Sequence, residues 1–135
     1  MPQHKKILVQ IAIEKSDAAL KTSCETLDIN LNNAQNRAYY AIFYIVSALA
    51  YLDDFQSKSH HFLMGQFNKR YIHEQKLFDK SLNKIYKTLI RNREASDYDF
   101  TYKLTKDNVL KDIEDAKMFI ETVKPYILER LNELI

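Results

Sequence analysis

Three side chains late in the sequence have the types and spacing to bind a phosphate group or move a proton. Arg93, Asp97 and Tyr98 lie in the stretch RNREASDYDF, which covers positions 91–100. A guanidinium binds phosphate or carboxylate oxygens through paired N–H groups. A phenol with a pKa near 10 is a poor base at neutral pH. The stretch therefore predicts either a phosphate-binding arginine or an arginine that pairs with the acid one helical turn later.

The helix predicted over about 79–96 places Arg93 on an apolar face. At 100° per residue, that face consists of Leu82, Tyr86 and Leu89. Burying an unpaired charge is costly. We therefore expect Arg93 to pair with Asp97 or to line a wet pocket that receives a ligand, and the sequence leaves both alternatives open.

A row of cations follows the other side of the same predicted helix. It consists of Lys80, Lys84, Lys87 and Arg91. Such a row can follow phosphate groups, but charged rows are usually solvent-exposed, and the helix dipole favours cations near a C-terminus. Arg91 and Arg93 are therefore expected to have different roles.

A second candidate surface lies on the helix predicted over about 31–55, which is apolar on nearly every side and so is expected to be buried by several neighbours. One side of it carries Arg37, Tyr40, Ala41, Tyr44, Ala48 and Tyr51. The alanines allow another helix to approach closely, and the tyrosines place hydroxyls in an apolar region. Plain core packing, with Arg37 at the helix start, is the alternative.

Metal and cofactor motifs are not expected. His60 and His61 are adjacent and would point to different faces of a helix, unlike a metal-binding pair four residues apart. One glycine cannot build a Walker loop or a GxGxxG motif. Spacing gives no reason to place either histidine beside Arg93, and Cys24 is expected in the core as a small hydrophobe.

Length and composition favour a single domain over residues 1–135, built as an all-α up-and-down bundle of four to five helices. One glycine and two prolines leave few turns. Ser57 or Ser59 is expected to cap the third helix and Thr105 the fifth, and Asp53 and Asp54 should fray the end of the second. No apolar run reaches about 18 residues, and a lone cysteine suits a reducing compartment, so a soluble cytoplasmic protein without a membrane partner is expected.

Together, NRAYYAIFYIVSALAYL, SHHFLMGQF and RNREASDYDF resemble the HEPN family, the "higher eukaryotes and prokaryotes nucleotide-binding" domain, from about Asn32 to the end of the chain. His60 matches a histidine that often opens the third helix of the family. Arg93, Asp97 and Tyr98 match an R-x-x-A-D-Y form of one prokaryotic branch, with serine for the alanine. Ribonuclease members instead carry R-x4-6-H, an arginine followed by a histidine after four to six intervening residues. In this chain Tyr98 occupies the position that follows four intervening residues.

The resemblance implies a compact bundle that forms symmetric dimers, often beside a small nucleotidyltransferase in a toxin–antitoxin pair. We therefore expect a dimeric, non-hydrolytic partner of a nucleotidyltransferase that binds nucleotide or RNA around Arg37, Tyr40, His60, Arg93, Asp97 and Tyr98. A metal-independent endoribonuclease toxin, with Tyr98 or His60 in place of the missing histidine, is the first alternative. A helical scaffold without a ligand is the second.

The small-residue face of the second helix gives an independent reason to expect a homodimer. It consists of Ala34, Ala38, Ala41 and Ala48. Together with the apolar surface around it, this face needs to be covered from more than one side. A two-fold copy of the chain would supply that cover.

Overall fold

The computed structural model describes residues 2–99 and 101–134, which form five α-helices and one π-helical turn without any strand. The elements are α1 (Pro2–Thr26), α2 (Leu31–Asp53), α3 (His60–Phe67), η1 (Asn68–Glu74), α4 (Ser81–Tyr98) and α5 (Lys106–Asn132). The side chains of Ser59 and Thr105 cap α3 and α5, because they accept hydrogen bonds from the backbone N–H of Phe62 and Asn108. The prediction of an all-α bundle is confirmed.

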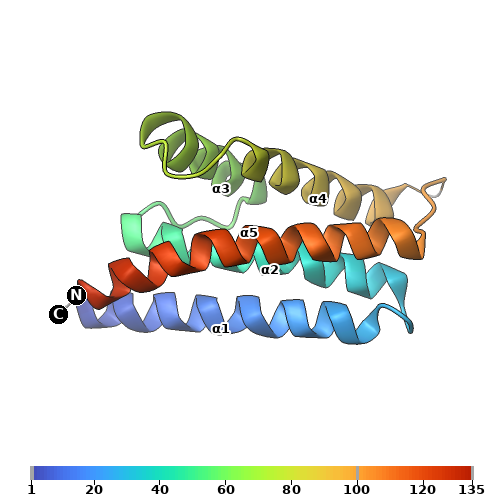
Figure 1. Cartoon of the computed structure of the whole chain (residues 1–135), viewed down its shortest axis with the longest axis horizontal. Helices are drawn as coiled ribbons and strands as arrows, with labels where there is room; N and C mark the ends of the chain where they lie inside the picture. The colour runs from blue at the N-terminus through green and yellow to red at the C-terminus, as the bar shows by residue number, and fades with distance from the viewer. Residues whose placement is uncertain (1, 100, 135) are drawn as a thin grey trace.

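The central element of the bundle is α2, which contacts each of the other four α-helices. Figure 1 shows α1, α2 and α5 running side by side, with α3 and α4 on the other side of this group from α1. This position explains the sequence of α2, which must be apolar on nearly every side to be buried by several neighbours. The start of α1 and the end of α5 lie at the same end of the bundle (Figure 1).

Small side chains let α1 approach α2 closely. The hydroxyl of Ser16 donates to the carbonyl of Ala41 at 2.7 Å, and that of Ser23 to the carbonyl of Ala34 at 2.5 Å. The small-residue face of α2 (Ala34, Ala38, Ala41 and Ala48) is fully buried within one chain. The expected close approach of another helix is confirmed, but that helix is α1. A homodimer stays a prediction and has to use a different surface.

The inward face of α1 differs from the predicted one at its C-terminal end. Cys24 is exposed, and Ser23 takes the buried position. At 100° per residue, position 23 lies nearly in line with Ser16, whereas position 24 is rotated by about 80° from it. The prediction that Cys24 is a core residue was therefore wrong.

The C-terminal end of α2 is held in place by a distant cation. Asp53 accepts hydrogen bonds from Arg130 of α5 at 2.7 and 3.3 Å, and from the hydroxyl of Tyr71. Burial acts to raise the pKa of Asp53, but these hydrogen bonds and the charge of Arg130 lower it below its ordinary value. Asp54 ends the helix in the left-handed region, with φ 61°. The ion pair opposes the unfavourable helix dipole at this end, and the expected fraying stays a prediction.

Candidate functional site

Arg93 extends the buried face of α4 beyond the core. Tyr86 and Leu89 on this face are fully buried, and the Arg93 side chain one turn later is only 16% exposed. Its nearest acid is Asp97, whose Oδ2 lies 3.5 Å from Nε, at the outer limit of a hydrogen bond. The face predicted for Arg93 is confirmed, and its pairing with Asp97 is present but long.

Two aromatic rings and an imidazole complete the surroundings of Arg93. Its guanidinium carbon lies 5.3 Å from the ring centre of Tyr39 and 5.5 Å from that of Tyr40. The negatively polarised ring faces attract a cation at this distance. Burial acts to lower the pKa of Arg93, but the two tyrosines and Asp97 raise it above its ordinary value. Arg93 therefore carries a permanent positive charge.

His60 brings α3 to the arginine. Its Nδ1 lies 3.3 Å from Nη1 of Arg93 and 2.7 Å from the hydroxyl of Tyr39. The ring stacks on Phe43 of α2, with centroids 4.3 Å apart and 14° between the planes. Because a guanidinium can only donate, Nδ1 has to be an acceptor, and the proton of the neutral ring is on Nε2.

Two of these groups are held in their neutral forms. The pKa of His60 lies below its ordinary value because of burial and, next, the positive charges of Arg93 and His61. Burial also raises the pKa of Tyr39 well above that of a free phenol. At neutral pH the site therefore contains a neutral imidazole and a neutral phenol beside a charged guanidinium.

A second arginine contacts the same cluster. The guanidinium carbon of Arg37 lies 4.7 Å from the ring centre of Tyr40. Its only hydrogen bonds within the described chain go to the Asn36 side-chain oxygen, at 2.9 and 3.1 Å, and it forms no ion pair there. Tyr40 thus contacts two guanidinium groups, and among the described residues only Asp97 is a carboxylate partner of either. The uncompensated positive charge suits an anionic ligand, and phosphate oxygens match its donors.

Five of the six residues predicted for the site come together: Arg37, Tyr40, His60, Arg93 and Asp97. Tyr98 does not join them, since it is 78% exposed at the end of α4. Phe100, which closes the stretch RNREASDYDF, lies outside the described residues. Tyr39 and Phe43, which orient His60, were not among the predicted site residues. Their spacing of four on α2, next to Tyr40, was the available signal.

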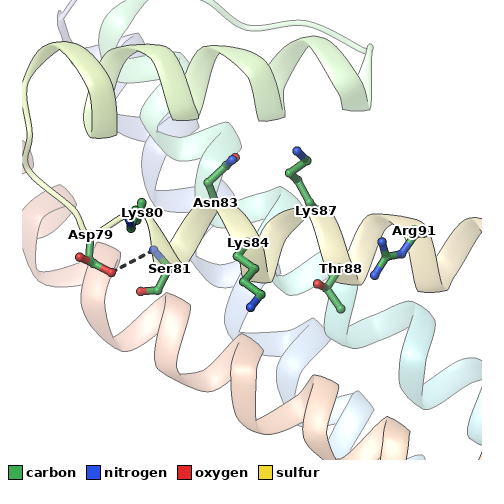
Figure 2. A pocket seen from close by; sticks show the side chains of 8 residues that line it. All are labelled: Asp79, Lys80, Ser81, Asn83, Lys84, Lys87, Thr88 and Arg91. Atoms are coloured by element: carbon green, nitrogen blue, oxygen red, sulfur yellow. Dashed lines mark hydrogen bonds between the residues drawn. The ribbon is translucent and has the colours of Figure 1, made fainter.

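The basic row of α4 lies apart from this cluster. Lys80, Lys84, Lys87 and Arg91 are all exposed, and within the described chain none of them forms an ion pair. Together with Asp79, Ser81, Asn83 and Thr88, they line an open hollow of about 540 Å³ (Figure 2). Every lining residue comes from one stretch, 79–91. This geometry favours a solvated face, and the different placement of Arg91 and Arg93 is as predicted.

Two other features follow from the described part of the chain. No group of three histidine, cysteine, aspartate or glutamate side chains in it is arranged to hold a metal ion. None of its helices combines the length and the apolar character needed to cross a membrane.

The fold and the cluster define a class of small helical bundles in which an arginine near the end of the fourth α-helix meets side chains of the second and third. The sequence profile of the HEPN domain matches residues 7–126, and the chain belongs to the HEPN family.

Two relatives support this assignment. The chain is 31% identical over 97 residues to a UPF0332 protein of Thermotoga maritima, which covers 72% of this chain and 73% of the relative. It is 26% identical over 119 residues to a protein of Methanocaldococcus jannaschii named as a candidate toxin, with 87% of this chain and 80% of the relative covered.

Proposed function

We propose that this HEPN protein binds the phosphate groups of a nucleotide or of RNA at the cluster around Arg93. The observation that carries the proposal is the pair of guanidinium groups on one ring, Arg37 and Arg93 on Tyr40, with a single carboxylate placed 3.5 Å from Arg93. A purely structural arginine would be expected to form a close bidentate pair with its acid. The observed arrangement instead leaves guanidinium donors free for an anion.

The binding is proposed to be non-hydrolytic. The acceptor nitrogen of His60 is already engaged by Tyr39 and Arg93, so it does not face a substrate as a free base. Tyr98, the other proposed substitute for a catalytic histidine, is exposed outside the cluster. The protonated Nε2 of His60 can still donate a hydrogen bond to a phosphate oxygen.

The biological context that we propose is a toxin–antitoxin-like pair. The relative from M. jannaschii is named as a candidate toxin, and the family resemblance implies a homodimer and a small nucleotidyltransferase as partner. Co-expression with the neighbouring gene, followed by mass spectrometry of the purified complex, tests the partner. Light scattering at tens of micromolar tests the homodimer, and a monomer at that concentration would count against it.

A second candidate function is a metal-independent endoribonuclease, and the position of His60 favours it. An imidazole and a guanidinium within 3.3 Å are the two groups that RNA cleavage needs, one for proton transfer and one for phosphate charge. In the tautomer that the Arg93 contact requires, however, the nitrogen that would take a proton faces Arg93. A rearranged imidazole would be required, so this candidate ranks second.

Binding and cleavage assays separate the two candidates. We expect Arg93→Ala to weaken binding of a labelled mononucleotide roughly ten-fold to a hundred-fold, since a charge-assisted hydrogen bond contributes about 1.5–3 kcal/mol. Arg91→Ala is the matched control, because it removes the same charge from the outer face of α4. Single-stranded RNA should stay intact in the presence of a chelator. Cleavage that is lost in His60→Ala would favour the ribonuclease.

A further inference from the structure

A groove follows the junction of α1, α2 and the α2–α3 connection. It borders His60, which contacts Arg93 of α4. Three hollows of about 200, 370 and 300 Å³ form it. The first two share Lys15 and Tyr44 as walls, and the last two share Tyr51 and Lys58 among others. The hollows therefore join into one path.

The charges along this groove have one sign. Arg37, Lys15 and Lys58 line it, and no aspartate or glutamate of the described chain does. None of these three cations forms an ion pair with another described residue. The Nζ atom of Lys15 lies 5.7 Å from the ring centre of Tyr44 and has no hydrogen bond to the rest of the described chain. The groove thus presents uncompensated positive charge to whatever occupies it.

Aromatic side chains alternate with these cations. Phe43, Tyr44 and Tyr51 are half-buried in the walls of the groove. Aromatic rings interleaved with cations are typical of surfaces that bind single-stranded nucleic acid, in which bases stack on rings while the cations follow the phosphates. In a duplex the base faces are stacked on one another and cannot reach the rings. An acidic peptide would pair with the cations but has no bases to stack on the rings.

The groove is also continuous with the site proposed above. His60 and Phe43 are among the residues that line its middle hollow. His60 contacts Arg93 through Nδ1 on one side and stacks on Phe43. Arg37, at the other end of the path, contacts the same Tyr40 ring as Arg93. The Arg93 site therefore borders the groove at two places, the neutral His60 ring and the charged Arg37.

We propose that this groove binds a single-stranded nucleic-acid segment, whose bases stack on Tyr44 and Tyr51 and whose phosphates meet Lys15 and Lys58. The inference rests on the proposed function, because it extends the phosphate site at Arg93 into a path for several nucleotides. The chemistry is shared by RNA and DNA, and the experiment below distinguishes the two.

Fluorescence anisotropy with labelled 12-nucleotide oligouridylate, its DNA counterpart and a mononucleotide tests the groove. Wild-type protein should bind the oligonucleotides at least tenfold more tightly than the mononucleotide. The double variant Lys15→Ala/Lys58→Ala should lose at least tenfold in oligonucleotide affinity and keep its mononucleotide affinity. Tyr51→Leu, which keeps an apolar side chain but removes the ring, should lose roughly tenfold, in line with about 1–3 kcal/mol per stacked base.

The matched control is Lys84→Ala/Lys87→Ala, which removes the same two charges from the basic row of α4. Circular dichroism melting establishes that each variant is folded. An equal loss in this control and in Lys15→Ala/Lys58→Ala would overturn the groove and indicate only net charge. A change of oligomeric mass in the Lys15→Ala/Lys58→Ala variant, with oligonucleotide binding unaltered, would overturn it in favour of an interface between copies.

The groove and the Arg93 site fail separately. If the wild-type protein does not bind the mononucleotide, the proposal of a phosphate site at Arg93 is wrong. The groove is then still tested by the binding of the oligonucleotides. If the mononucleotide binds in an Arg93-dependent manner but oligonucleotides bind no more tightly, the groove fails alone. Tighter binding of RNA than of DNA would identify RNA as the ligand. Equal binding would show that the groove recognises the bases and phosphates that RNA and DNA share.

Discussion

His60 and Arg93 are 33 positions apart, yet Nδ1 of the histidine lies 3.3 Å from Nη1 of the arginine. The contact places a neutral imidazole against a permanent cation, which is stable only while the ring remains unprotonated. The hydroxyl of Tyr39 donates to the same nitrogen at 2.7 Å and fixes that tautomer. The protonation state of one histidine is therefore set by side chains from two other helices.

The first prediction concerns the pKa of His60. NMR titration should give a value below 6.5, and Arg93→Ala should raise it, because a nearby positive charge disfavours imidazolium. Arg91→Ala removes an equal charge from the outer face of α4 and should leave the titration unchanged. An unaltered His60 titration in Arg93→Ala would show that the contact is absent in solution.

The same shift predicts how stability depends on pH. The folded pKa of His60 is lowered, so between that pKa and 6.5 the unfolded chain binds more protons than the folded one. The contribution of His60 is present above pH about 6.5 and is lost as the pH falls. Urea unfolding from pH 7.5 to 5.5 should show a smaller loss of stability in His60→Gln than in the wild type. Equal losses would contradict the prediction.

The pairing of Arg93 with Asp97 should contribute little to stability. The two groups lie four residues apart on α4 with a single contact of 3.5 Å, and their side chains are 16% and 28% exposed. Pairs of this kind contribute about 0.2–0.5 kcal/mol. A double-mutant cycle of Arg93→Ala and Asp97→Ala, measured by urea unfolding, should give a coupling below about 1 kcal/mol. Strong coupling without an effect on nucleotide binding would leave Arg93 a structural residue.

The fold was predictable because it depends on local patterns. Few turn residues, the apolar stripes and the capping residues Ser59 and Thr105 define the helices before any tertiary contact is known. Position 24 was harder, because a single residue separates the inward and outward faces of α1. The conformation at the end of α2 depends on Arg130, which pairs with Asp53 although the two residues are 77 positions apart. No local pattern contains that partner.

The site was predictable only in part, for a similar reason. The face of Arg93 follows from the period of α4, and its aromatic neighbours come from the side of α2 that carries Tyr40. The placement of His60 depends on how the α2–α3 connection folds back, and spacing cannot give this. The family resemblance indicated the histidine, and the structure gave the contact.

Arg130, near the C-terminal end of α5, should contribute substantially to the free energy of unfolding. It donates to both oxygens of Asp53 and to the hydroxyl of Tyr126 at 2.8 Å, joining the ends of α2 and α5. We expect Arg130→Met to reduce the free energy of unfolding by about 1.5–3 kcal/mol at pH 7. Because the pKa of Asp53 is lowered, this contribution is present above its ordinary value of 3.8 and is lost as the pH falls through the folded pKa.

Lys124→Met is the control for Arg130. Lys124 pairs with Asp17 at 3.0 Å at the surface, and such pairs contribute about 0–1 kcal/mol. Chemical unfolding of both variants at pH 7 compares a bidentate pair with an ordinary one. Equal and small losses would show that the α2–α5 connection does not depend on Arg130.

The last prediction concerns Asp112 of α5, a carboxyl group that is 4% exposed. Asn92 donates to its two oxygens at 3.1 and 3.2 Å, and no cation in the described chain pairs with it. Burial raises its pKa, so the folded protein holds this proton more tightly than the unfolded chain does. The contribution of this group is therefore complete below pH 3.8 and is lost as the pH rises through the folded pKa.

Asp112→Asn keeps the shape and removes the charge, so it should stabilise the protein at pH 7 and change stability less at pH 4. Urea unfolding at the two pH values measures this difference. Asp115→Asn, three residues later on α5, is the matched control: it breaks a pair with Lys111 at 3.1 Å and should destabilise slightly at pH 7. If Asp112→Asn destabilised the protein at pH 7, the hydrogen bonds from Asn92 would outweigh the cost of burying the carboxylate, and the pKa of Asp112 would not be raised.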